Sequence, residues 1–74
     1  MKKPPTWERG WSYREYRKML ALWHKLAGPH LGPENMSSML LFNLRGRAQQ
    51  VLLRRPEEEL EDFWGCVRAL DCEY

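Results

Sequence analysis

The chain has 74 residues, with 12 Lys or Arg against 10 Asp or Glu and a formal net charge of +2. A chain this short forms one domain at most and buries only about 60% of its unfolded surface, so its four Trp, three Tyr and two Phe must supply much of the core. It has no apolar run of about 18 residues and no signal-peptide pattern, so we expect a protein of the reducing cytoplasm that makes no membrane contact.

Residues 1–10 are predicted to form an extended arm, because Pro4-Pro5 and Gly10 disfavour a helix. Trp7 is the side chain best suited to anchor this arm, either by folding back over the helices or by contacting another molecule. Trp11, directly before the first helix, is expected to pack across that helix's first turn. Because Trp is enriched at the centres of interfaces, we predict Trp7 and Trp11 as subunit or peptide contacts.

The first helix is predicted over about residues 12–27. Ser12 and Glu15 have the Ser-x-x-Glu spacing of a capping box, which fixes the start of a helix. Gly28 followed by Pro29 predicts its end. Its buried stripe at helical spacing is expected to contain Tyr16, Met19, Leu20, Trp23, Leu26 and Ala27.

The second helix is predicted over residues 33–44, because Pro33 and Glu34 are typical of a first helical turn. Its apolar residues cover most of its circumference, which predicts the central position in the fold; they are Met36, Met39, Leu40, Leu41, Phe42 and Leu44. Gly46 ends it, and a short third helix is expected over residues 47–54.

The fourth helix is predicted over residues 57–73, since Pro56 precedes three glutamates that complement the positive end of a helix dipole. Apolar residues keep helical spacing to the end of the chain: Leu60, Phe63, Trp64, Val67, Leu70 and Tyr74. Cys66 and Cys72 would lie on different faces of this helix, too far apart to form a disulfide. The fold class is therefore all-α, a compact bundle of four helices over residues 11–74 with an extended N-terminal arm.

Charge is segregated along the chain. Residues 1–55 hold 11 Lys or Arg and 3 Glu, giving +8, whereas residues 56–74 hold one Arg and 7 acids, giving −6. Such a molecule can attract copies of itself, and we predict weak, salt-dependent homo-oligomers. The acidic contacts would come from Glu58, Glu59 and Asp62.

The sequence shows no pattern typical of catalysis. No nucleophile elbow, phosphate loop or dinucleotide motif is present, and His24 and His30 lack the partners of a metal site. We therefore predict no enzyme activity, no catalytic residue, no metal, no cofactor and no small-molecule substrate.

The basic residues allow a second interpretation, in which the domain binds RNA or DNA through phosphate contacts. Six side chains near the first and third predicted helices could form the patch: Arg14, Arg17, Lys18, Lys25, Arg45 and Arg47.

The order of these features resembles the N-terminal capsid lobe of retrotransposon Gag polyproteins. The resemblance spans about residues 7–74 and rests on Trp11, Tyr13, Tyr16, Trp23, Pro33-Glu34, Leu40-Leu41, the run Leu44-Arg45-Gly46-Arg47-Ala48, the acidic turn before Leu60, and Leu70-Asp71-Cys72-Glu73-Tyr74. It implies a small helical lobe that makes subunit contacts in a self-assembling shell, followed in the parent protein by a second capsid lobe. Neither that lobe nor an RNA-packaging Cys-Cys-His-Cys knuckle lies in these residues. The resemblance also implies a third interpretation, a domesticated lobe that binds a peptide.

Overall fold

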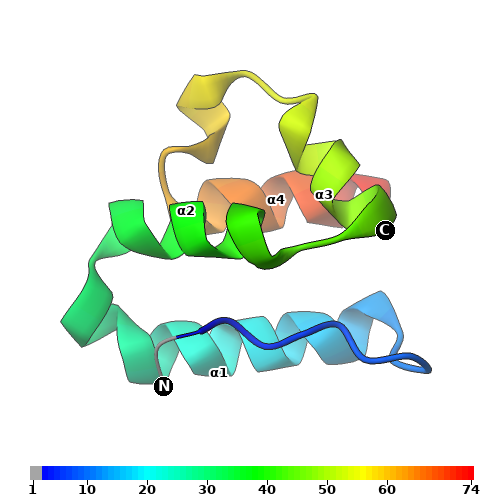
Figure 1. The fold of residues 1–74 in the computed structure, drawn as a ribbon, viewed down its shortest axis with the longest axis horizontal. Coiled ribbons are helices and arrows are strands. Elements are labelled where there is room, and N and C mark those ends of the chain that lie inside the picture. The colour runs from blue at the N-terminus through cyan, green and yellow to red at the C-terminus, as the bar shows by residue number, and fades with distance from the viewer. Residues whose placement is uncertain (1–2) are drawn as a thin grey trace.

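The computed structural model describes residues 3–74 as an all-α fold with an extended N-terminal arm (Figure 1). The helices within this range are α1 (Tyr13–Leu31), α2 (Pro33–Asn43), α3 (Gly46–Leu53), the short 3-10 helix η1 (Glu57–Leu60) and α4 (Phe63–Glu73). No strand forms in the described part of the chain. The predicted fold class is confirmed. Of the predicted arm, residues 1–2 lie outside the described range.

Helix α2 lies at the centre, in contact with α1, α3 and α4. In Figure 1, α1 runs along one edge of the molecule and η1 lies at the opposite edge, with α2 between them. The predicted central position of the second helix is therefore confirmed. The arm runs alongside α1, so its residues lie over the same helix that they precede in the sequence.

One hydrophobic core joins the four α-helices. Its largest fully buried side chains are Trp23, Tyr16, Phe63, Leu20, Met36, Leu40, Leu52, Leu70 and Val67. The Trp23 indole N–H is buried without a hydrogen-bond acceptor among residues 3–74. Such an unmatched donor costs about 1–3 kcal/mol, which the burial of the indole ring offsets.

The start of α1 is as predicted, but its end is not. The Ser12 hydroxyl accepts from the Glu15 N–H, and the Glu15 carboxylate accepts from the Ser12 N–H. The helix then continues past Pro29 to Leu31. The glycine that ends it is Gly32, whose φ of 82° lies in the region that favours glycine. Gly28 instead lies inside the helix, where a Cβ would make an ordinary contact 3.6 Å from the Met36 sulfur.

Helices α2 and α3 begin and end within about one residue of their predicted bounds. The apolar stripes were predicted less well. Leu26 is 49% exposed and Phe42 is 77% exposed. Both side chains therefore lie largely outside the core.

The predicted continuous helix over residues 57–73 is wrong. The chain forms one turn of 3-10 helix and then starts again at Asp62, whose backbone is extended and whose carboxylate accepts from the Gly65 N–H at 2.6 Å. The glutamates after Pro56 therefore begin η1, and Asp62 is the true N-cap of α4. Gly65 permits this corner, because a Cβ there would collide with the Glu59 carbonyl oxygen.

Candidate interaction surfaces

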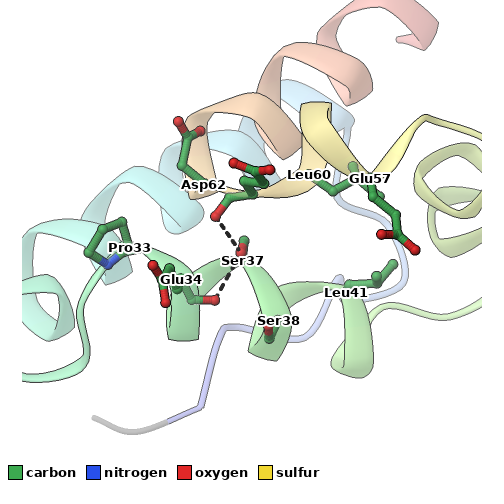
Figure 2. Close-up of a pocket in the computed structure, with 9 residues that line it drawn as sticks. Pro33, Glu34, Ser37, Ser38, Leu41, Glu57, Leu60 and Asp62 are labelled. Atoms are coloured by element: carbon green, nitrogen blue, oxygen red, sulfur yellow. Dashed lines mark hydrogen bonds between the residues drawn. The ribbon is translucent and has the colours of Figure 1, made fainter.

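A groove of about 700 Å³ lies between α2 and the segment 57–62 (Figure 2). Ser37 lies between the two sides, and its hydroxyl donates to the Glu34 carbonyl of its own helix at 2.9 Å and lies 3.3 Å from the Glu61 carbonyl on the other side. Half-buried Leu41 and Leu60 provide apolar surface inside it. Ser37 is itself buried, so α2 and residues 57–62 are in close contact at this point.

The polar lining of the groove is acidic. Four carboxylates line it, and no Lys or Arg does: Glu34, Glu57, Glu61 and Asp62. Within residues 3–74 none of the four makes an ion pair, and Asp62 alone has a backbone partner, the N–H of Gly65. Like charges collected without a counter-charge favour a cationic occupant.

The acidic contacts predicted from the sequence are divided between the groove and a smaller hollow beside it. Asp62 lines both, whereas Glu58 and Glu59 line only the smaller hollow, which also contains Arg55 and Arg68. Glu59 forms an ion pair with Arg55 at 3.6 Å. The sequence did not predict Glu34 as a groove residue, because it belongs to a different helix from the acidic run. It also gave no reason to distinguish Glu57 and Glu61, which line the groove, from the glutamates next to them.

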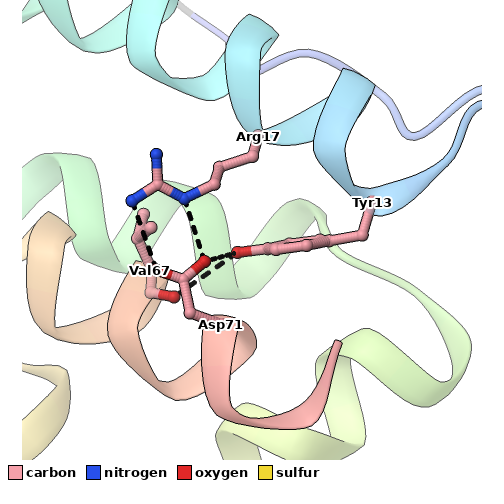
Figure 3. Close-up of polar contacts among 4 residues, drawn as sticks. All are labelled: Tyr13, Arg17, Val67 and Asp71. Atoms are coloured by element: carbon pink, nitrogen blue, oxygen red, sulfur yellow. Dashed lines mark hydrogen bonds and ion pairs between the residues drawn. The ribbon is translucent and has the colours of Figure 1, made fainter.

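A polar cluster joins α1 to α4 (Figure 3). Arg17 donates to both carboxylate oxygens of Asp71, at 2.9 and 3.2 Å. The Tyr13 hydroxyl donates to the same carboxylate at 2.6 Å and lies 3.4 Å from the Val67 carbonyl. The two-point contact and the shared oxygen make this cluster a fixed link between the helices.

The charges in this cluster shift each other's protonation. Hydrogen bonding from Arg17 lowers the pKa of Asp71, and the bond from Tyr13 adds to the effect. Burial, followed by the contact with Asp71, raises the pKa of Tyr13 above its ordinary value. All three groups therefore keep their usual charge states at neutral pH.

The six basic residues predicted as nucleic-acid contacts divide into two groups. Arg17 is bound to Asp71, Arg47 pairs with Glu73 at 3.0 Å, and Arg45 donates to the carbonyls of Phe42 and Leu44. The other three are exposed on α1 and make no ion pair inside the described range: Arg14, Lys18 and Lys25. The structure does not bring all six together as one free patch.

The arm is anchored by aromatic contacts. The Trp7 ring stacks on Tyr16 with centroids 5.0 Å apart and meets Tyr74 edge-on at 5.2 Å. Its indole N–H donates to the Trp11 carbonyl at 2.9 Å, and Trp11 packs against the core. Both tryptophans are half-buried. Trp7 therefore folds back over the helices, and its predicted role as a subunit or peptide contact stays a prediction.

His24 and Cys66 make packing contacts within the fold. His24 stacks on Phe63 with ring centroids 4.9 Å apart. Cys66 and Cys72 both have free thiols, the first buried and the second exposed, as their predicted separation on one helix requires. Burial raises the pKa of the Cys66 thiol to about 11, which keeps it protonated and unreactive. Within residues 3–74, no three His, Cys, Asp or Glu side chains gather where they could hold a metal ion.

Comparison with known proteins gives no relative: no family model, curated protein or solved structure matches this chain. The helices of residues 3–74 include none with the length and apolar content needed to cross a bilayer.

Proposed function

We propose that this chain is a non-enzymatic protein–protein association module, a Gag-like N-terminal capsid lobe that contributes to the self-assembly of a shell. The observation that carries the proposal is the placement of unpaired charge. Exposed cations lie on α1 and unpaired carboxylates line the groove beside η1, and these two elements occupy opposite edges of the molecule.

This separation supports self-association because two copies can bring opposite charges together without either copy refolding. The order of sequence features that resembles Gag capsid lobes adds independent support. Exposed apolar side chains supply further contact area, notably Phe42 and Leu53, which is 56% exposed. In the longer parent protein, a second capsid lobe would strengthen contacts that are weak in this domain alone.

Sedimentation velocity over a concentration series, at low and at high salt, tests the proposal. We expect the weight-average sedimentation coefficient to rise with protein concentration at low salt and the rise to shrink at high salt, because salt screens exposed charges. A sedimentation coefficient that is independent of concentration at both salt levels would contradict it.

A short RNA added to the same series distinguishes the nucleic-acid interpretation. Three exposed cations on one helix favour that alternative: Arg14, Lys18 and Lys25. A protein that stays monomeric alone and shifts only with RNA would support nucleic-acid binding, with an affinity that falls steeply as salt rises.

A further inference from the structure

The acidic groove and the outer face of α1 carry complementary charges. On α1, four exposed residues lie on the side away from the buried stripe, at spacings of three or four residues: Arg14, Lys18, Leu22 and Lys25. Leu22 is 44% exposed, so this face presents one apolar side chain flanked by cations. The groove presents the reverse arrangement, half-buried leucines flanked by carboxylates.

We propose that the groove between α2 and residues 57–62 binds the outer face of α1 from a second copy of this chain. This inference rests on the proposed function and names the two surfaces that would carry it. Leu22 of one copy would lie against Leu41 and Leu60 of the next, as an apolar helix side chain does in a helix-in-groove contact. The lysines on either side would meet the carboxylates at the two ends of the groove.

The lengths of the two surfaces agree. Lys18 and Lys25 are seven residues apart, which is about 10 Å along a helix at 1.5 Å per residue. Glu34 and Leu41 line the groove along α2 and are also seven residues apart, so they span about the same 10 Å. In Figure 2, Glu34 lies at one end of the groove, and Glu57 lies beside Leu41 at the other. A lysine at each end of α1's outer face can therefore meet a carboxylate at each end of the groove.

Figure 1 shows α1 and η1 at opposite edges of the molecule, so one copy cannot turn its α1 and its groove toward the same partner, and the contact is heterologous. Each copy then keeps a free groove after its α1 is bound and a free α1 after its groove is filled. Heterologous contacts extend into rings or open chains rather than closing as a two-fold dimer. The sedimentation coefficient should therefore keep rising past the dimer value. One groove buries less surface than a stable complex needs, so the contact should be weak.

Charge reversal on the two surfaces tests the inference. A groove variant, Glu34→Lys/Glu57→Lys, and a helix variant, Lys18→Glu/Lys25→Glu, should each self-associate about tenfold or more weakly than the wild type at low salt, because like charges then face each other at both ends of the groove. Mixed in equal amounts, the two variants should associate again, since each supplies the charge that the other has lost.

The control is Glu8→Lys, which reverses the charge of an exposed glutamate of the arm that lies outside the groove and makes no ion pair within residues 3–74. It should keep near-wild-type association, and circular dichroism should show that every variant is folded. If the wild type associates but the groove variant behaves like this control, or if the mixture stays monomeric, the groove assignment is overturned while the proposed function stands. A wild type that is monomeric at every concentration overturns both.

Discussion

The two ends of the acidic segment 57–73 use their carboxylates differently. At the far end, Asp71 is bound to Arg17 on α1, and Glu73 is bound to Arg47 on α3. At the near end, Glu57 and Glu61 line a groove that contains no cation. An acidic run therefore has no single role. A carboxylate links helices where the fold brings an arginine beside it, and elsewhere it stays available to a partner.

Gly65→Ala should break the corner where these two ends meet and should have the largest effect. The new Cβ would collide with the Glu59 carbonyl and lie 3.1 Å from the Asp62 carboxylate, so the N-terminus of α4 must move. We expect a loss of about 3 kcal/mol in the free energy of unfolding, measured by denaturant titration. Gly28→Ala is the control, since its Cβ makes an ordinary contact 3.6 Å from the Met36 sulfur. Equal denaturation midpoints for the two variants would contradict the account of this corner.

Trp7→Ala should loosen the packing at the C-terminal end of the acidic segment, where the arm contacts Tyr16 and Tyr74. Removing a half-buried indole with its ring contacts should lower the free energy of unfolding by about 2 kcal/mol, less than for a fully buried Trp. Phe42→Ala removes another large ring that is 77% exposed, so it should cost far less. If thermal melts show the same loss for both variants, the arm is not held by Trp7.

Asp71→Asn should weaken the link between α1 and α4 by a smaller amount. It removes the charge of the two-point contact with Arg17 at a partly exposed site, so we expect a loss of about 1 kcal/mol. Glu73→Gln, whose partner Arg47 is largely exposed, should leave the denaturation midpoint unchanged. A larger loss for Glu73→Gln than for Asp71→Asn would reverse our ranking of the two links.

The contribution of Asp71 should also depend on pH, and this is the smallest expected effect. The pKa of Asp71 in the folded protein lies below the ordinary value of about 3.9 that it has in the unfolded chain. Its contribution to the free energy of unfolding is therefore complete above the unfolded-state pKa and is lost as the pH falls through the folded-state pKa. The difference in unfolding free energy between wild type and Asp71→Asn should therefore be constant from about pH 7 to 5 and shrink below about pH 4. A difference that stays constant down to pH 2 would exclude the ion pair as its source.

Local signals in the sequence predicted much of the fold. The capping box at Ser12, the proline and acid that start α2, and the apolar spacing of the core helices depend on residues within one or two turns of each other, so they can be recognised without a structure. The end of α1 was misplaced because the sequence offers two glycines for the role, and Gly32 with its positive φ ends the helix while Gly28 lies inside it.

The sequence by itself determined the helical class, the number of α-helices, the start of α1 and the segregation of charge. Only the tertiary structure decided which charges remain unpaired. The partners of Asp71 lie 54 and 58 residues away along the chain, and the groove joins Glu34 to acids more than twenty residues later. Charge pairing depends on distances in space, and the packing of α1, α2 and α4 sets those distances.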